Sequence, residues 1–265
     1  MNRDTARGLR CAATLVLLLA CCQIAASQKK TTITYKNITF TYDASLAKEY
    51  LGELISAVPL ASKSDKPDGV APQHLMISLK ESYVPSKRRN TPEGIPRVYF
   101  FPTADRSDSL FDDEFPTTRK AADDLNTYLS KHMHAEGEEI PFLPWADETQ
   151  AFIAKRKFIR FRNGRGVLFL TQYEQERTPV NNMDLVYCFQ GLTDDNITYV
   201  SAVFPVAAPG LPNSERGDKV DAFHTAYDRY ILETGQRLEK TPARNYSPNL
   251  SLLDDIIRSI KVSEQ

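Results

Sequence analysis

The side chains that could carry out chemistry are few, and none of the familiar catalytic spacings occurs. The chain of 265 residues has four histidines and four cysteines, and three of those cysteines lie in or beside an N-terminal apolar run: Cys11, Cys21 and Cys22. It contains no HExxH, GxSxG or CxxC string and no glycine-rich phosphate loop. The pattern therefore predicts neither a metal centre nor a nucleophile with a dedicated base, and no cofactor is expected.

The histidines and the remaining cysteine favour structural roles. His132 and His134 are two residues apart, and on a helix such a pair does not share a face. We therefore interpret them as an exposed helix end rather than as metal ligands. Cys188 lies in VYCFQ, a strand-like run, so it is expected to be a buried core residue.

Clustered carboxylates are explained by local structure. Asp194, Asp195 and Asn196 could be calcium ligands, but these residue types also tolerate turn geometry and bond their own backbone, which favours a hairpin turn. The adjacent pairs Asp123-Asp124 and Asp254-Asp255 fall on predicted helices. Neighbouring helical side chains point apart, so we expect solvated faces and not a catalytic carboxylate pair.

Charge distribution is the most suggestive feature. The segment from Asp105 to Glu148 contains twelve acids and four bases, whereas the segment from Lys155 to Arg165 contains six bases and no acid. Two interpretations stay open. The bases pair with the acidic region or protect an edge strand, or they form a surface for an acidic partner such as anionic lipid, polysaccharide or protein. The candidate binding residues of that surface are Arg160, Arg162 and Arg165, with Trp145 as a neighbour.

The N-terminus is typical of a secretion signal, residues 1–27. A positive start precedes the apolar run Cys11 to Ala20, which is shorter than the roughly 20 residues that a membrane-spanning helix needs. Two processing routes stay open. Leu18-Leu19-Ala20-Cys21 resembles a lipobox, in which Cys21 is lipidated, and Ala25-Ala26-Ser27 suits ordinary cleavage after Ser27. We expect an exported chain, periplasmic or extracellular, touching the membrane only through such a lipid.

Bulk composition indicates one ordinary globular domain. Residues 28–32 are expected to form a polar tether and 33–265 a single domain, because a domain of roughly 235 residues is large enough to rely on its core without disulfides. The formal net charge of −1 gives no reason to expect a nucleic-acid partner.

The segment from Phe158 to Val206 indicates the architecture. Asn163-Gly164 lies between two strand-like runs, as does the polar stretch from Gly191 to Asn196, so two antiparallel hairpins are predicted, the first with a type I′ turn. Val167 to Leu170 and Val203 to Val206 are apolar without alternation. Such strands are buried on both faces, which predicts a central, mostly antiparallel sheet in an α+β fold with helices on one or both faces.

The rest of the chain supplies strands and helices in turn. Ile33 to Tyr42 is a small hairpin or one bent strand, and Asp105 to Glu114 is turn-like. Strands are predicted over His74–Tyr83 and Arg97–Phe101, an apolar packed loop over Pro141–Trp145, and helices over Ala44–Ile55, Thr117–Met133, Asp218–Leu238 and Ser247–Val262, with Ser247 as the cap of the last helix.

Two resemblances follow from these residues. The strings FLPWADETQ, GVLFLTQYEQ and LVYCFQGLTDDNITYVSAVFPVAAPGLP resemble a family of uncharacterised exported bacterial proteins, which implies location but no activity. The order ITYKNITFTYD, central antiparallel meander and closing NLSLLDDIIRSIKV resembles the PsbP/Mog1-type α/β/α sandwich. That resemblance implies a binding or assembly role, and it assigns no functional residue.

These observations favour a non-enzymatic domain of the cell envelope that binds a protein or a small ligand. Two alternatives stay open: a hydrolase whose site is assembled from residues distant in sequence, and a binder of anionic surfaces through the basic hairpin. The ligand and the oligomeric state do not follow from the sequence.

Overall fold

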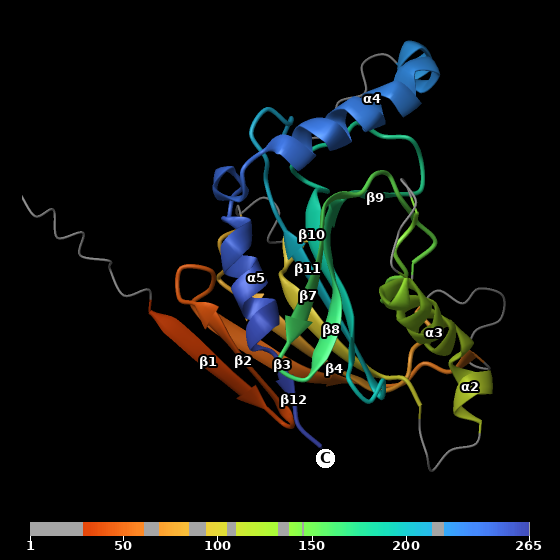
Figure 1. Ribbon diagram of the computed structural model, residues 1–265, viewed down its shortest axis with the longest axis vertical. Helices are drawn as coiled ribbons and strands as arrows, with labels where there is room; N and C mark the ends of the chain where they lie inside the picture. The colour runs from red at the N-terminus through yellow and green to blue at the C-terminus, as the bar shows by residue number, and fades with distance from the viewer. Residues whose placement is uncertain are drawn as a thin grey trace, which may run out of the picture.

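A seven-stranded sheet forms the centre of the molecule (Figure 1). The computed structural model describes residues 29–60, 69–84, 94–104, 110–131, 138–144, 146–213 and 220–264, with the side chains of 220–225 excepted. All pairings in this sheet are antiparallel. In spatial order its strands are β3 (Glu49–Ile55), β4 (His74–Lys80), β5 (Arg97–Pro102), β11 (Thr198–Pro205), β10 (Val186–Thr193), β8 (Gly164–Thr171) and β7 (Ala154–Phe161).

Helices and a second sheet cover the two faces. A three-stranded sheet joins β1 (Lys30–Tyr35), β2 (Ile38–Asp43) and β12 (Lys261–Val262), and a two-stranded ladder pairs β6 (Thr149–Gln150) with β9 (Tyr173–Glu174). The helices are α2 (Phe111–Glu114), α3 (Pro116–Ser130), α4 (Val220–Lys240) and α5 (Leu250–Ser259), with a 3-10 turn at Ala243–Asn245. Figure 1 shows α5 and the small sheet on one side of the central sheet and α3 on the other. The predicted α+β fold with a mostly antiparallel central sheet is confirmed.

Two cores explain the continuous apolar strands. On the α5 side, Leu168 and Phe189 pack with Phe40 of the small sheet and Ile257 of α5. On the α3 side, Val167, Phe169 and Cys188 pack with Leu125 of α3 and Leu143 of the following loop. Every residue of β10 is buried, as the two-sided pattern predicted. In the part of the chain that the structure describes, both cores are built from residues between Ile33 and Val262.

Both predicted hairpins are present, but the first turn has a different centre. Phe161 pairs with Gly164, so Arg162 and Asn163 occupy the two turn positions and Gly164 begins β8. Positive φ occurs at Lys36, Glu81, Lys155 and Asn196 but not at Arg162 or Asn163. The predicted type I′ turn is therefore wrong, and the glycine has another use. A Cβ at Gly164 would overlap the Phe161 ring and the Leu192 carbonyl.

The helix predicted over Ala44–Ile55 is wrong. Residues Glu49–Ile55 form β3, which pairs along its length with β4. The helical spacing of Tyr50, Leu51 and Leu54 does not mark a buried face, because all three side chains are at least 40% exposed. Pairing with β4 outweighs the local pattern, and Gly52, poor in a helix, fits beneath the Tyr35 ring.

Smaller differences lie at element ends. Asn249, not Ser247, caps α5 by accepting a hydrogen bond from the Ser251 backbone N–H at 3.0 Å. The helix ends at Ser259 and the chain continues as β12, which pairs with β2. The first residues of β1 belong to the segment expected as a tether, and the segment expected as a turn includes α2, whose Phe111 is buried. In the described part of the chain, no helix is both long and apolar enough to span a membrane.

Candidate functional site

The basic hairpin uses much of its charge within the fold. Arg160 donates two hydrogen bonds to the Asp194 carboxylate, at 2.8 and 3.0 Å, across the two hairpin loops. Lys157 pairs with Asp254 of α5, and the Lys155 ammonium donates to the Glu239 backbone carbonyl in α4. These partners lie outside the acidic segment Asp105–Glu148. The bases therefore bond within the fold, as the first interpretation expects, but to residues outside that segment.

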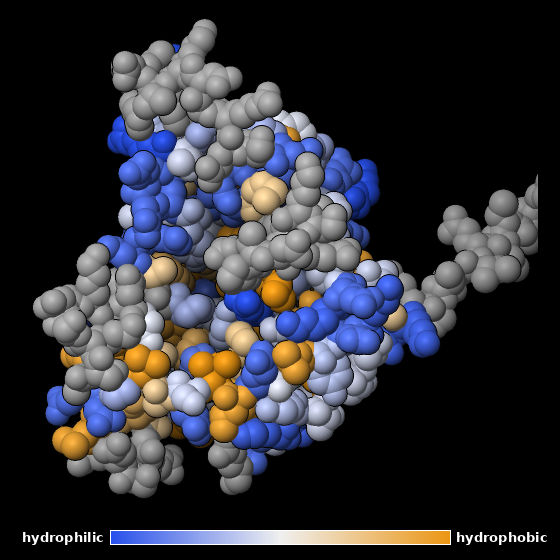
Figure 2. All heavy atoms as spheres, turned by 180° about the vertical axis from the view of Figure 1, so that it is seen from behind, coloured by the Kyte–Doolittle hydropathy of each residue, from blue (hydrophilic) through white to orange (hydrophobic). Residues whose placement is uncertain are grey.

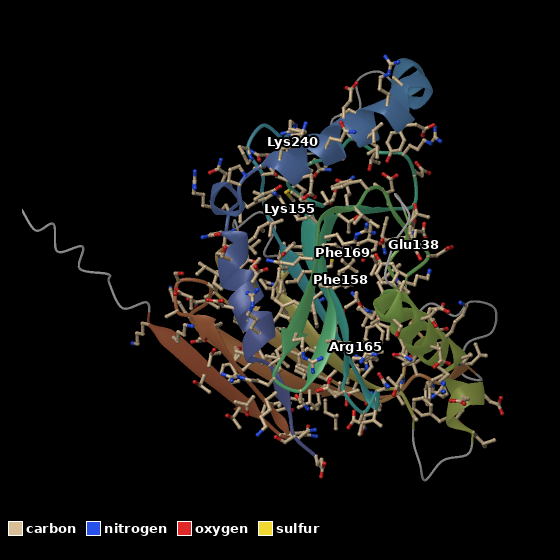
Figure 3. All side chains as sticks on the ribbon, viewed as in Figure 1. Glu138, Lys155, Phe158, Arg165, Phe169 and Lys240 are labelled. Carbon is tan, nitrogen blue, oxygen red and sulfur yellow. The ribbon has the colours of Figure 1, made fainter. Side chains whose placement is uncertain are left out.

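The candidate binding residues divide between two environments. Arg160 and Arg165 lie opposite each other in the hairpin, and the Arg165 guanidinium donates to the Asn126 side-chain carbonyl of α3 at 2.9 Å. Figure 3 shows Arg165 at the end of the hairpin, on the side of α3. Arg162 is exposed in the turn, where its backbone N–H donates to Ile260. Trp145 lies outside the described residues, as do Cys21, His132 and His134.

A shallow groove joins two of these arginines to an exposed aromatic ring. It has a volume of about 350 Å³ and is lined by Phe158, Arg160 and Arg165 with Leu129 and Lys131 from the end of α3. Phe158 is 49% exposed and stacks on Tyr128 with ring centres 6.2 Å apart. Because Arg160 and Lys131 are paired with Asp194 and Glu138, the free positive charge of this groove is small.

A more enclosed cavity lies on the same face of the sheet, at the start of β5. Its volume is about 390 Å³. The lining combines apolar side chains with three charged ones, Arg97, Glu148 and Asp184. We call it the Arg97 cavity. Figure 2 shows that the side of the molecule opposite to that of Figure 1 is hollowed near its centre, with polar and apolar side chains mixed around the hollow.

One wall of the Arg97 cavity is fixed by a buried hydrogen-bond network. The Gln190 side-chain carbonyl accepts from the Leu143 backbone N–H at 3.2 Å. Its amide nitrogen donates to the Ser201 hydroxyl oxygen at 3.1 Å. The Ser201 hydroxyl in turn donates to the Leu143 carbonyl, and the Tyr199 hydroxyl donates to Pro141 at 3.0 Å. Since Gln190 and Ser201 are buried, the loop that carries Leu143 is held against the sheet, and the cavity wall is preformed.

Arg97 is the unusual residue of this cavity. It is half-buried, and within the described part of the chain it forms no ion pair, while its Nε atom is buried without an acceptor. Burial raises the pKa of the adjacent Tyr99 hydroxyl, and the Arg97 guanidinium beside it partly offsets that rise. A cation removed from water without a carboxylate partner carries a desolvation cost that a bound anion would offset.

A larger cavity lies at the opposite end of β5. It has a volume of about 600 Å³ and is lined by His74, Glu114 and Lys36 together with apolar residues that include Phe100 and Phe115. His74 is 8% exposed, and its Nδ1 lies 2.8 Å from the Pro72 carbonyl, so Nδ1 carries the proton and Nε2 is the acceptor. Burial lowers the pKa of His74, and the Pro72 hydrogen bond partly opposes this shift.

Asp254 is buried, and the expectation of a solvated Asp254-Asp255 face is wrong for this residue. The Asp254 carboxylate accepts from the Tyr187 hydroxyl at 2.9 Å and from Lys157. Burial, followed by the Asp254 charge, raises the pKa of Tyr187. The group joins β10, β7 and α5, so its role is structural. Asp255, by contrast, is exposed.

Cys188 is fully buried, as expected for a core residue. Burial raises the pKa of its thiol to about 12. The thiolate is the reactive form, so this residue is unsuited to nucleophilic chemistry. The Asp194–Asn196 loop is a turn in which Asp195 accepts from the Thr193 hydroxyl at 2.6 Å and from the Ile197 backbone N–H at 3.1 Å.

Comparison with known proteins gives no further guidance to the site: no family model matches the chain, and the search of curated proteins finds no match. The assignment therefore depends on the geometry.

Sequence reasoning missed Arg97, although a signal was present. In RVYFF the arginine and Tyr99 are two residues apart, so both side chains project from the same face of a strand whose other residues are apolar. A cation on a face that is otherwise apolar indicates either a buried partner or a ligand.

Proposed function

We propose that this chain is a non-enzymatic, exported binding domain that holds a small ligand in the Arg97 cavity. The observation that carries the proposal is the half-buried Arg97 guanidinium, which has no carboxylate partner among the described residues and lines a cavity of about 390 Å³. This volume lies within the usual range of small-molecule sites, which combine apolar walls with a few fixed polar groups.

The charges of the cavity define the class of ligand. Arg97 suits a carboxylate, whereas Glu148 and Asp184 oppose a purely anionic molecule. Val186 and Val203 supply an apolar wall. A small molecule with a carboxylate, an ammonium or other donor group, and an apolar body fits best, and a hydrophobic amino acid is the simplest member of that class.

Isothermal titration of the purified chain with three matched probes tests the proposal. Phenylalanine carries both charges, phenylacetate carries only the anion and phenethylamine carries only the cation. We expect phenylalanine to bind most tightly and Arg97→Gln to weaken it by about 10- to 100-fold, as for loss of a charge-assisted hydrogen bond.

Arg162→Gln is the matched control, because Arg162 is an exposed arginine that does not line this cavity. It should leave phenylalanine binding unchanged. Equal binding of phenylalanine by the wild type and by Arg97→Gln, or no binding of any of the three probes, would contradict the proposal.

The export of the chain belongs to the same proposal. It is supported by the charged start, the short apolar run and the small residues that follow it. Mass spectrometry of the N-terminal peptide from the envelope fraction distinguishes the two routes. A diacylglyceryl group on Cys21 indicates a lipoprotein, and a peptide that begins at Gln28 indicates ordinary cleavage.

The anionic-surface alternative has weaker support. Arg160, Lys157, Lys155 and Arg165 all donate to partners within the fold, so the exposed Arg162 is the candidate residue most available for such contacts. The alternative predicts salt-sensitive binding to vesicles with anionic lipid that is lost when Arg160, Arg162 and Arg165 are replaced. Unchanged binding in that variant would end it.

The hydrolase alternative would use the cavity of about 600 Å³ that His74 lines. His74 presents a neutral ring there, and Glu114 lines the same space. Turnover of a panel of ester and amide substrates that disappears in His74→Gln would favour this alternative over a pure binding role. The PsbP/Mog1-type resemblance, through its implied binding role, agrees with the proposal made above.

A further inference from the structure

In the part of the chain that the structure describes, no strand pairs with the outer edge of β3. β3 is the first strand of the seven-stranded sheet, and among the described residues its ladder partner is β4 alone. It contains seven residues, EYLGELI, with no proline, no lysine and no bulge. Proteins normally protect an edge strand with such devices or with other charged side chains, because unpaired N–H and C=O groups accept a further strand. The charges of β3 are those of Glu49 and Glu53, which a further strand must accommodate.

The side chains of β3 add an apolar surface to this edge. Tyr50, Leu51 and Leu54 are 40%, 43% and 43% exposed. Tyr50, Gly52 and Leu54 share one face because strand side chains alternate. The Tyr35 ring of β1 covers Gly52 on that face. In Figure 2, apolar side chains gather in the lower half of the view, over the part of the molecule where Figure 1 shows β3, β4 and α2.

We infer that β3 pairs with β3 of a second copy of this chain, antiparallel about a two-fold axis at Gly52. Such pairing continues the sheet across two molecules, and it needs no partner that this chain does not itself provide. It places Tyr50 opposite the second copy's Leu54 twice, once on each side of the axis, with the two Gly52 residues facing each other between them.

Charge selects this register among its neighbours. Residues paired across a two-fold axis lie on the same face, so the axis must pass through a residue position and not between two. An axis at Leu51 places Glu49 opposite Glu53 of the second copy, and an axis at Glu53 places the two Glu53 side chains opposite each other. Like charges directly opposite destabilise a sheet. With the axis at Gly52, Glu53 faces Leu51 and Glu49 faces Ile55.

The Tyr35 ring of the same copy explains why a glycine occupies the centre. A Cβ at Gly52 would lie 2.6 Å from the Tyr35 ring. Because Gly52 has no side chain, the Tyr35 ring covers the strand close to the axis. In the dimer, the Tyr35 rings of the two copies therefore flank the two facing Gly52 residues. The apolar Tyr50–Leu54 contacts lie on the same face.

Sedimentation velocity over a concentration series of the purified chain tests this inference. We expect a concentration-dependent dimer. Tyr50→Lys and Leu54→Glu, made separately, should each weaken it by about tenfold or more, because each variant disrupts two cross-strand apolar pairs. Leu232→Lys is the matched control, since Leu232 is an apolar residue of α4 that is 51% exposed, and it should leave the dimer intact.

Mixing the two variants tests the register. An equimolar mixture of Tyr50→Lys and Leu54→Glu brings the introduced ammonium of one copy opposite the introduced carboxylate of the other. A heterodimer should therefore form at concentrations at which neither variant dimerises alone. A chain that remains monomeric at every concentration, a dimer that Tyr50→Lys leaves unchanged, or a mixture without heterodimer would each overturn the inference.

Discussion

The two edge strands of the central sheet differ in how they are protected from pairing with a further strand. β7 is protected: it carries a bulge between Ala154 and Lys157, Lys155 adopts a φ of 56°, and its freed backbone N–H donates to the Glu239 carboxylate of α4. β3 has no bulge and no covering helix among the described residues, and its charged residues are the acids Glu49 and Glu53.

The contrast shows how charge in a sequence misleads. The six bases of Lys155–Arg165 attract attention as a binding surface, yet several of them fix β7 to α4, α5 and the Asp194 loop. β3 has no conspicuous composition and its spacing predicts a helix, yet among the described residues it is the edge strand whose outer edge nothing covers. Accessibility follows from what packs around a strand and not from its own charge.

The largest expected effect concerns the protected edge. Asp254→Ala removes the acceptor of the buried Tyr187 hydroxyl and the partner of Lys157. We expect the free energy of unfolding, measured with urea, to fall by about 2–3 kcal/mol, because a buried hydroxyl is left unpaired while the half-exposed Lys157 recovers some hydration.

Asp255→Ala is the control for this change, because the Asp255 side chain is 54% exposed. It should alter the unfolding free energy by less than about 0.5 kcal/mol. Equal effects of the two substitutions would show that the Lys157–Asp254 pair does not stabilise the β7 edge.

A smaller effect is expected where the small sheet supports the open edge. Gly52→Ala introduces a Cβ at 2.6 Å from the Tyr35 ring, which should lower the unfolding free energy by about 1–2 kcal/mol. In a Tyr35→Ala background the same substitution should cost little, since the ring that it meets is absent. A double-mutant cycle measures the difference, and additive effects would show that Tyr35 does not constrain Gly52.

The end of β3 pairs with His74, and this pair gives a pH dependence. Ile55 is the ladder partner of His74, whose pKa is lowered from 6.5 by burial. As the pH falls through 6.5 the unfolded chain binds the proton first, so stability due to neutral His74 is present above 6.5 and is lost below it. The slope for one group is at most about 1.4 kcal/mol per pH unit.

Urea unfolding at intervals from about pH 7.5 to about pH 5 checks this expectation, since that range spans the ordinary pKa of histidine. His74→Gln should flatten the curve in that range, and the difference between the two curves isolates His74 from other titrating groups. If the curves of unfolding free energy against pH run parallel for the wild type and His74→Gln, folding does not penalise the protonated form of His74.

The smallest effect should come from the exposed pair at the protected edge. The Arg160 and Asp194 side chains are 65% and 49% exposed, so Arg160→Ala should cost less than about 1 kcal/mol, although one guanidinium nitrogen contacts both carboxylate oxygens. The coupling in a cycle with Asp194→Ala should fall further at about 1 M salt. A coupling free energy above about 2 kcal/mol would mean that this exposed pair stabilises the fold about as much as the Lys157–Asp254 pair does.

Much of the fold could be predicted because local patterns and tertiary packing agree. Val167–Leu170 is apolar at every position, and both faces of that strand are covered. α3 and α4 were expected from the spacing of their apolar residues, and both form close to the expected bounds. β3 failed because its apolar residues match a helical spacing by chance, and only the neighbouring β4 selects the extended form.

The candidate site could not be predicted in the same way. Arg97, Leu143, Asp184 and Gln190 come from separate segments, and no local spacing relates them. Their meeting depends on strand order, which places β5 beside β11 and β11 beside β10. The Arg-rich hairpin was found because its residues are consecutive, which is a property of the chain and not evidence of a site.

By itself, the sequence determined the class of fold, the two central hairpins and the burial of Cys188, because hydrophobic periodicity and turn residues act over a few neighbours. Tertiary structure alone decided which cations are neutralised, that Asp254 is buried, that Glu49–Ile55 is a strand and that Arg97 faces a cavity. Each of these depends on a partner distant in the chain, and pairwise electrostatics and strand pairing have no local signature until the fold brings the partners together.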